Sequence, residues 1–413
     1  MRSPSTASGS AEARVEAGSA QGRDLRLFIV AGEHSGDALG AKLMAALNAS
    51  HPGTIRYLGV GGPGMAREGL ASLFPLDDVA VMGPVAILPR LPRLLNRISA
   101  TVAAALEAEP DAVVIIDSPE FTHTIARRIR RKRPDIPIIN YVSPSVWAWR
   151  PGRARKMRAY VDHVLAHWPF EPAAHQRLGG PPCTFIGHAL IERHPWIAAL
   201  DPAPLAERLG LTRGRPVLVL LPGSRSSEVA RLMQPFGEAI AGLLAKGHEI
   251  ELLMPIVASV RPMVERSLAT WPKRPHLIEG EEDKFRAFKL AQVALAASGT
   301  VTLELALAGT PMVVAYKVDA LIAPLLRRLI VAPSIVLANL VLGENVFPEF
   351  AQEKCTGANL AAALSPLLGA SEARSRQLAA LQRMPAALHV NKPPSEAAAE
   401  IVLHYASCGR AQP

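Results

Sequence analysis

The feature that most constrains this chain is a recurring order of apolar run, short turn and amphipathic helical pattern. In the first copy, apolar residues 25–30 lead into a turn at 31–36 and a helical pattern at 37–47. Parallel strands joined by helices produce this order. The first part of the chain therefore predicts a parallel βαβ domain. Its expected strands are residues 25–30, 55–60, 112–116, 136–141 and 163–166.

The same order starts again after the proline-containing stretch 202–214. A chain of 413 residues that is 49% hydrophobic is long enough to build two cores of this kind. We therefore predict an α/β fold with two Rossmann-like doubly wound domains. The expected strands of the second domain are residues 216–221, 250–254, 293–296 and 311–316, and the helical patterns that close the chain are 359–368, 371–388 and 396–405.

The net charge of the chain limits the classes of partner that it could bind. A net charge of +9 suits nucleic acid, anionic lipid or phosphorylated substrates. Aromatic residues are only 5% and do not interleave with the basic clusters, so we predict no nucleic-acid partner. The three cysteines have no C-x-x-C spacing, which excludes a disulfide framework or zinc site and fits a reducing cytoplasm.

No segment is expected to span a membrane. The longest uncharged apolar stretch, residues 329–343, contains Pro333 and is shorter than the roughly 20 residues that a spanning helix needs. Residues 1–24 are rich in Ser, Ala, Gly, Glu and Arg without an apolar region. We interpret them as a disordered tail rather than a secretory signal.

Ligands of open α/β sheets bind beyond the carboxyl ends of the strands, so the turns there are the candidate sites. The first turn, Ala31-Gly-Glu-His-Ser-Gly-Asp37, enters a helix whose free amides suit a phosphate or sugar oxygen. Its candidate substrate-binding residues are Glu33, Ser35, Gly36 and Asp37. The alternative is that Ser35 or Asp37 only caps the helix.

A carboxylate, Asp117, follows the apolar run 112–116 at the rim of the predicted sheet. That position suits a general base that removes a proton from a sugar hydroxyl. The alternative is that Asp117 caps the next helix.

The next turn, residues 141–156, places Trp147 and Trp149 beside a cationic stretch. The tryptophans suit a sugar face and the cations suit phosphate. Its candidate substrate-binding residues are Ser143, Ser145 and Trp147. In the alternative interpretation the tryptophans are buried and Arg155 with Lys156 lies on a solvated helix face.

Two turns of the second domain suit a nucleotide diphosphate. In residues 220–229 a strand turns into a helix that begins with hydroxyls and an arginine, which suits a diphosphate. Residues 297–304 repeat this geometry, and Glu304 suits two ribose hydroxyls. The alternatives are a capped helix and a surface carboxylate. The candidates are Gly223, Ser224, Arg225, Ser298, Gly299, Thr300 and Glu304.

Taken in order, these motifs make the chain resemble the lipid-A-disaccharide synthases from about residue 27 to residue 388. The matching stretches include Ala-Gly-Glu-x-Ser-Gly-Asp, Tyr-Val-Ser-Pro-Ser-Val-Trp-Ala-Trp, Pro-Phe-Glu-Pro at 169–172, Leu-Pro-Gly-Ser-Arg and Ala-Ser-Gly-Thr-x-x-x-Glu. The resemblance implies GT-B architecture, with two Rossmann-like domains facing a cleft. It also implies that the counterparts of Asp117, Arg225 and Asn339 act in catalysis.

The implied reaction is the inverting transfer of a sugar between two acylated substrates. UDP-2,3-diacylglucosamine would be the donor, and 2,3-diacylglucosamine 1-phosphate (lipid X) the acceptor, giving a β-1,6-linked disaccharide 1-phosphate and UDP. No Asp-x-Asp motif is present, so we expect neither a metal nor a cofactor. Where the family usually has a Glu in the Met-Gly-x-x-Glu stretch, this chain has Ala86.

The expected organisation is a tail (1–24), an acceptor- and membrane-facing domain (25–195), a UDP-sugar domain (196–370) and C-terminal helices (371–413). These last helices would pack back on the first domain or on a partner, as in a homodimer. The segments 81–98 and 321–342 combine apolar residues with arginines, which favours peripheral attachment to the anionic cytoplasmic face of the inner membrane. In the alternative, both are core helices.

Other functions predict other properties. A peptidoglycan-type N-acetylglucosaminyltransferase or a UDP-sugar 2-epimerase would use similar phosphate turns and would accept water-soluble UDP-N-acetylglucosamine. A non-catalytic lipid- or nucleotide-binding protein would tolerate Asp117→Asn. A dinucleotide-dependent dehydrogenase is disfavoured because no G-x-G-x-x-G follows a strand.

Overall fold

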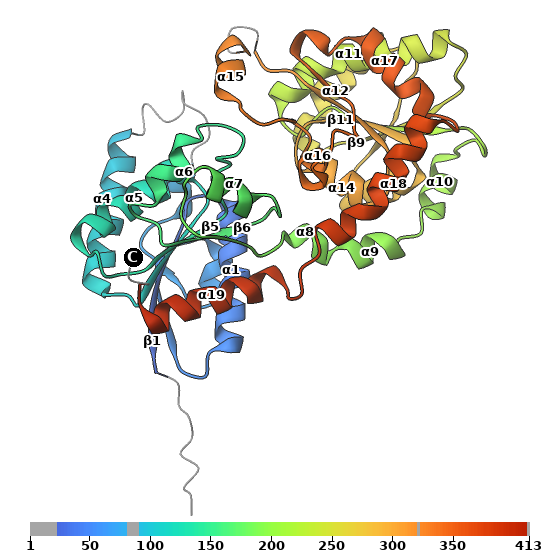
Figure 1. Ribbon diagram of the computed structural model, residues 1–413. Coiled ribbons are helices and arrows are strands. Elements are labelled where there is room, and N and C mark those ends of the chain that lie inside the picture. Colours follow the sequence, from blue (N-terminus) through green and yellow to red (C-terminus); the bar gives the residue numbers. More distant parts are fainter. Residues whose placement is uncertain (1–22, 81–90, 320–322, 411–413) are drawn as a thin grey trace, which may run out of the picture.

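The computed structural model describes residues 23–80, 91–319 and 323–410. The chain forms two lobes, each with its own parallel sheet (Figure 1). The two predicted doubly wound domains are thereby confirmed. Most of the expected tail, Ala86 and part of the apolar segment 81–98 lie outside the described residues.

The sheet of the first lobe has the order β3-β2-β1-β4-β5-β6-β7, and all neighbours are parallel. Its central strands β1 and β4 are almost wholly buried apolar runs, as expected for strands covered on both faces. The strands are β1 (Leu25–Ala31), β2 (Ile55–Val60), β3 (Ala71–Ser72), β4 (Ala112–Ile116), β5 (Ile138–Tyr141), β6 (His163–Ala166) and β7 (Cys183–Phe185).

Helices cover both faces of this sheet. On one face, α4, α5 and α6 bury residues such as Val102, Ile125 and Met157. On the other face, α1 and α2 bury Leu43, Leu47 and Met65. The helices of this lobe are α1 (His34–Ser50), α2 (Pro63–Arg67), α4 (Leu91–Ala108), α5 (Pro119–Lys132), α6 (Gly152–Met157) and α7 (Glu171–Arg177), with a 3-10 turn at η1 (Leu76–Asp78).

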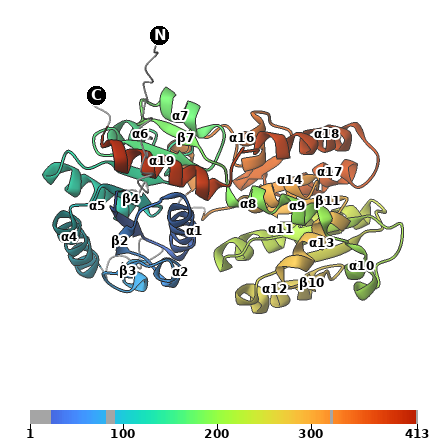
Figure 2. The ribbon, with the colours of Figure 1, turned by 90° about the horizontal axis from the view of Figure 1, so that it is seen from below.

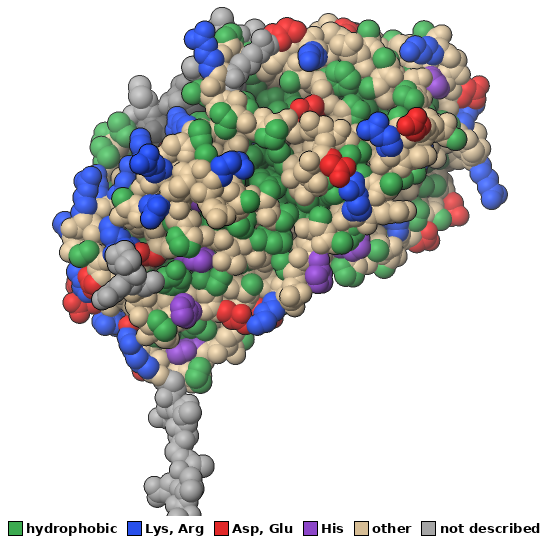
Figure 3. Space-filling model, in the orientation of Figure 1, with side chains coloured by type: hydrophobic (Ala, Val, Ile, Leu, Met, Phe, Trp, Pro, Cys, Tyr) green, Lys and Arg blue, Asp and Glu red, His purple; other side chains and the backbone are tan. Residues whose placement is uncertain are grey.

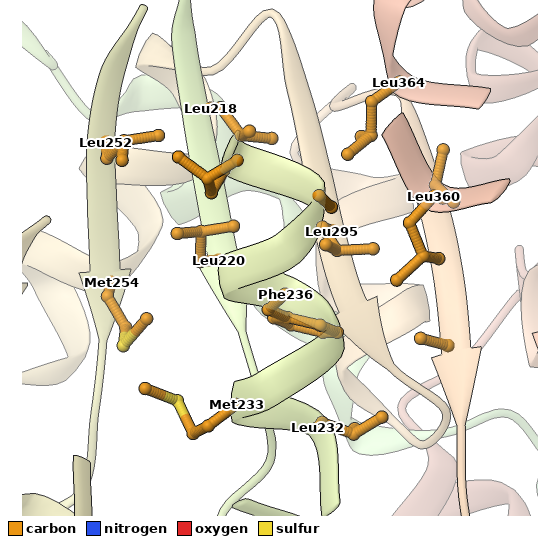
Figure 4. Packing of buried hydrophobic residues seen from close by; sticks show 14 of the residues in the cluster. Leu218, Leu220, Leu232, Met233, Phe236, Leu252, Met254, Leu295, Leu360 and Leu364 are labelled. Atoms are coloured by element: carbon orange, nitrogen blue, oxygen red, sulfur yellow. The ribbon is translucent and has the colours of Figure 1, made fainter. Parts of the chain in front are cut away.

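The second lobe repeats the plan with the order β10-β9-β8-β11-β12-β13. Leucines of its strands face α11 and α17 across one layer of the core (Figure 4). The strands are β8 (Val217–Leu221), β9 (Glu251–Pro255), β10 (His276–Ile278), β11 (Val293–Ala297), β12 (Met312–Tyr316) and β13 (Glu349–Ala351). The helices are α10 (Ala203–Leu209), α11 (Ser226–Ala245), α12 (Arg261–Ser267), α13 (Glu281–Leu290), α14 (Val301–Leu307), α15 (Ala323–Leu329), α16 (Leu337–Leu342), α17 (Gly357–Leu364) and α18 (Glu372–Ala387), with 3-10 turns η3 (Ala258–Val260), η4 (Leu268–Thr270), η5 (Gln352–Lys354) and η6 (Ser365–Leu367).

The chain crosses between the lobes twice. Helices α8 (Ala189–Glu192) and α9 (His194–Ala199) lie along the first crossing. After α18, which packs on the second lobe, the chain returns, and α19 (Pro394–Cys408) packs against α1 of the first lobe (Figures 1 and 2). The described part of the stretch 371–413 is thus divided between the two lobes. In the described ranges, no helix combines the length and apolar character needed to cross a membrane.

Candidate functional site

The strand order places two of the predicted turns side by side in the first lobe. Strands β1 and β4 are neighbours, although β2 and β3 lie between them in sequence, so this is a point where the strand order reverses. A Cβ on Gly32 would lie 2.4 Å from Ser118 Cβ, so only glycine fits there. Next to it, the Ser118 hydroxyl donates a hydrogen bond to Glu33 Oε1 at 2.9 Å. The turns after β1 and β4 therefore form one surface.

Asp117 lies on this surface in a constrained backbone. Its φ is 52° and that of Ser118 is 43°, both left-handed values that are uncommon outside glycine and that often occur at functional sites. The Asp117 Oδ1 atom accepts a hydrogen bond from the Ser118 amide at 2.8 Å. The carboxylate is half-buried, and no cation of the described residues forms an ion pair with it. A carboxylate held in this way is suited to accept a proton.

The other candidates of the first turn differ in their exposure to solvent. Ser35 is exposed at the start of α1, whereas Gly36 is buried against Ile116. Asp37 is also buried, and its two oxygens accept hydrogen bonds from the amides of Gly62, Gly64 and Met65 at 2.8–2.9 Å. This use of both oxygens favours a structural role for Asp37, which holds the start of α2.

The turn after β5 is held in place by hydrogen bonds to buried side chains. Ser143 is buried and hydrogen-bonded to His175 Nε2 at 2.9 Å, while the Trp147 indole donates to Glu171 Oε1 at 3.0 Å. Ser145 is half-buried and adopts a φ of 46°. Burial raises the pKa of Glu171 to about 7 against the opposing effect of its hydrogen bonds, and burial lowers that of His175 to about 4. Sequence reasoning missed both of these residues, although the Pro-Phe-Glu-Pro motif contains Glu171.

In the second lobe, the two predicted phosphate turns line one pocket of about 350 Å³. They follow β8 and β11, which are neighbours in the sheet and form its own strand-order reversal. The pocket contains every candidate named there from sequence: Gly223, Ser224, Arg225, Ser298, Gly299, Thr300 and Glu304.

Two further charged residues line this pocket: Lys284, which sequence reasoning missed, and Glu228, which it placed only in the capped-helix alternative, facing solvent. Glu228 Oε2 accepts hydrogen bonds from the amides of Ser224 and Arg225, and Glu228 Oε1 accepts one from Arg225 Nη1 at 2.8 Å. Lys284, from α13, donates to both oxygens of Glu304 at 2.9–3.0 Å. The Arg225 side chain is 69% exposed, so it is free to turn toward an anion. The charge-rich start of α13 was the only signal for Lys284.

Asn339 does not line this pocket. It is 2% exposed; its Oδ1 accepts the amides of Val346 and Phe347 at 3.0 Å, and its Nδ2 donates to the Phe347 carbonyl. The Ser298 hydroxyl donates to the Ile335 carbonyl at 2.6 Å. The Ser298 and Asn339 side chains therefore hold in place the segments that follow β11 and β12. This makes Asn339 a positioning residue that does not itself face the pocket.

The two carboxyl edges face each other. The backbone of Trp149, after β5, pairs with that of Ile330, after β12, and the Val331 amide donates to the Ala148 carbonyl at 2.8 Å. Trp168, after β6, packs against the core of the second lobe. Figure 3 shows hydrophobic side chains along the region between the lobes. The turn that bears Asp117 and the pocket that contains Arg225 thus belong to the two sides of one interlobe region.

Comparisons with known proteins identify the family of this chain. The family model described as lipid-A-disaccharide synthetase matches residues 27–402. The chain belongs to the lipid-A-disaccharide synthase family. Lipid-A-disaccharide synthase from Rhodopseudomonas palustris strain BisB18 is 52% identical over 379 residues, which cover 92% of this chain and 95% of that protein. The family member from Nitrobacter hamburgensis is 50% identical, covering 94% and 97%.

Solved structures of similar shape confirm the GT-B architecture of this family member. The UDP-GlcNAc 2-epimerase from Neisseria meningitidis, bound to UDP-GlcNAc, has a TM-score of 0.55 at 13% identity and covers 92% of this chain and 99% of that one. A glycosyltransferase from Rickettsia africae has a TM-score of 0.56 at 12% identity and covers 93% and 98%. At these identities the likeness concerns the fold alone.

Proposed function

We propose that this chain transfers the sugar of UDP-2,3-diacylglucosamine to the 6-hydroxyl of 2,3-diacylglucosamine 1-phosphate, forming a β-1,6-linked disaccharide 1-phosphate and UDP. Membership of the lipid-A-disaccharide synthase family carries this proposal. The two reversal points support it, because one presents a carboxylate and the other a pocket suited to a nucleotide diphosphate.

The donor nucleotide is assigned to the pocket of the second lobe. The amides after Gly223 and Gly299 and the Ser224 and Thr300 hydroxyls suit the diphosphate, with Arg225 neutralising its charge as UDP leaves. Glu304 has acceptor capacity left beside Lys284, because an ionised carboxylate has about four lone-pair sites, so it can accept ribose hydroxyls.

The acceptor is assigned to the first lobe. Asp117 takes the proton of the 6-hydroxyl while that oxygen attacks the anomeric carbon, and UDP departs from the opposite face, so the anomeric configuration inverts. Glu33, bonded to Ser118, keeps the two turns together during this step. The buried pair of Trp147 and Glu171 fixes the neighbouring turn.

The proposal includes attachment to an anionic membrane surface and a homodimer. Leu91 and Leu95 of α4 are more than 40% exposed beside Arg93, and Val331 is 54% exposed, a combination that suits an interfacial position. The seat of α19 on α1 would be the same if α19 came from a second copy through the 388–394 crossing. Vesicle sedimentation and light scattering test these two points.

The test of the reaction uses purified protein in detergent with the donor and labelled acceptor, with and without EDTA. Asp117→Asn keeps an oxygen for the Ser118 amide but removes the base, so we expect transfer to fall by about 10²–10⁴-fold. Asp135→Asn changes an exposed carboxylate that lies three residues beyond the end of α5; it is the matched control and keeps wild-type activity.

The outcomes separate two parts of the proposal. Wild-type protein that forms no disaccharide and releases no UDP would refute the reaction. A fully active Asp117→Asn variant would refute only the assignment of the base. Turnover of UDP-N-acetylglucosamine alone would favour an epimerase.

A further inference from the structure

A second hollow, of about 530 Å³, lies between α5 and α6 of the first lobe. Four cations line it: Arg127, Arg150, Arg153 and Lys156. Figure 3 shows Lys and Arg side chains over this part of the lobe. None of the residues to which the proposed function assigns a role lines it, so its charge needs a separate explanation.

The positive charge of this basic hollow is not balanced by the protein. Glu120 is the one carboxylate of its lining; it accepts Arg153 Nη2 at 2.8 Å and lies 3.6 Å from Arg150 Nη1. Burial, reinforced by the charge of Arg153, lowers the pKa of His123 to about 4, so this lining histidine is neutral at pH 7. The hollow therefore carries four positive charges against one negative.

Two of the four cations have no carboxylate partner among the described residues. Arg127 donates only to the His123 carbonyl at 3.1 Å and to the Thr124 hydroxyl at 3.2 Å. Lys156 forms no ion pair within the described ranges. In the donor pocket, by contrast, Arg225 pairs with Glu228 and Lys284 with Glu304. The basic hollow thus has more unpaired positive charge than the donor pocket and should attract an anion more strongly.

The hollow begins beside the proposed base. Pro119 and Glu120 line it, and they are the second and third residues after Asp117. Two trans peptide units place the Cα atoms of Asp117 and Pro119 no more than about 8 Å apart. That separation is comparable to the width of one sugar ring with its substituents. A sugar anchored in the hollow by one substituent can therefore present another substituent to Asp117.

We infer that the basic hollow binds the 1-phosphate of the acceptor, a phosphomonoester on a glycolipid, and so orients the 6-hydroxyl toward Asp117. This inference rests on the proposed function. A phosphomonoester carries nearly two negative charges at pH 7, with three acceptor oxygens, and arginine forks bind it in bidentate fashion. The phosphate on C1 and the CH2OH group on C5 stand on the two carbons that flank the ring oxygen, so one sugar ring separates an anchored phosphate from the reacting hydroxyl by a distance that hollow and base can span. In the absence of ligand Arg153 pairs with Glu120, and the phosphate takes the place of this carboxylate when it binds.

The test measures KM for the acceptor with and without its 1-phosphate, in detergent at saturating donor. Lys156→Gln and Arg127→Gln each remove one charge from the hollow, whereas Arg155→Gln removes one from α6 outside its lining. We expect KM for the phosphorylated acceptor to rise about tenfold or more in the first two variants, as for the loss of one charge-assisted hydrogen bond. KM for the dephosphorylated acceptor stays unchanged, Lys156→Arg restores the wild-type value, and Arg155→Gln changes neither.

The other outcomes overturn the inference. Equal changes for both acceptors would mean that the cations do not bind the phosphate. Loss of sedimentation with phosphatidylglycerol vesicles at an unchanged KM in detergent would assign the hollow to membrane headgroups instead. If the wild type transfers no sugar, the proposed function fails, and calorimetry with glucosamine 1-phosphate decides on the hollow: binding that Lys156→Gln weakens supports a phosphate site, and no binding refutes it.

Discussion

Glu171 shows how one buried side chain can hold two turns at the carboxyl edge of a sheet. It is 1% exposed, and its two oxygens accept the Trp147 indole and the Trp168 amide, each at 3.0 Å. These residues come from the turns after β5 and β6, so one carboxyl group ties two turns together. Because burial raises the pKa of Glu171 to about 7, its protonation changes within the physiological range.

This pKa predicts a pH-dependent contribution to stability. Between pH 4.5 and about 7 the folded protein keeps a proton on Glu171 that the unfolded chain releases, so the free energy of unfolding decreases as the pH rises. The full difference corresponds to roughly 3 kcal/mol. Glu171→Gln lacks this contribution, so the stability of the wild type relative to the variant should fall across that window.

Chemical unfolding at several pH values between 4.5 and 8 measures this difference. Glu107→Gln, an exposed position on α4, is the control and should follow the wild type. Parallel curves for wild type and Glu171→Gln would show that Glu171 keeps its ordinary pKa in the folded protein.

At the scale of elements, α19 completes the core of a lobe that begins more than 350 residues earlier in the chain. Its residues Ala398, Val402 and Ala406 are buried in the same cluster as Leu43 and Leu47 of α1. The contact uses small side chains, which allow the two helices to approach closely. The first lobe is therefore incomplete without the end of the chain.

Val402→Asp tests this contact. It places an unpaired carboxylate where the native side chain is fully buried, so we expect a loss of about 3 kcal/mol or more from the stability of the first lobe. Ser407→Asp makes the same change at an exposed position of α19 and should be nearly neutral. Urea unfolding and limited proteolysis measure the effect; equal midpoints for the two variants would argue that α19 is not seated on α1.

At the scale of the whole molecule, the two lobes meet through main-chain contacts at their carboxyl edges. Ala148 and Trp149 belong to the turn after β5, and Ile330 and Val331 follow α15. This contact links the turn after β5 of the first lobe to the segment that Asn339 and Ser298 hold in the second lobe. It sets how the proposed base faces the proposed donor pocket.

Val331→Pro removes the amide that donates to Ala148, whereas Val331→Ala keeps it. We expect the proline variant to transfer sugar several-fold more slowly, because small errors in the placement of reacting groups reduce rate strongly. Its affinity for UDP, measured by calorimetry, should be unchanged, since the proposed donor pocket lies within the second lobe. Equal transfer rates for the two variants would show that this contact does not set the lobe geometry.

The sequence by itself determined the central strands and the positions of the turns that hold the candidate site residues. The expected strands at 25–30, 112–116, 216–221 and 293–296 coincide with β1, β4, β8 and β11 to within a residue. Long runs of apolar residues leave little choice in a parallel sheet covered on both faces, so the turns at their carboxyl ends could be located in advance. The motifs that carry the family resemblance lie at these turns.

Only the tertiary structure decided which residues meet. The edge strands β3, β7, β10 and β13 have two or three residues each, too few for a periodic pattern, and were not expected. The bonds of Asp37 to the start of α2, of Lys284 to Glu304 and of Trp147 to Glu171 join separate elements. Such partners depend on the order of strands in the sheet, and the gathering of the basic hollow likewise required α5 and α6 to be placed side by side.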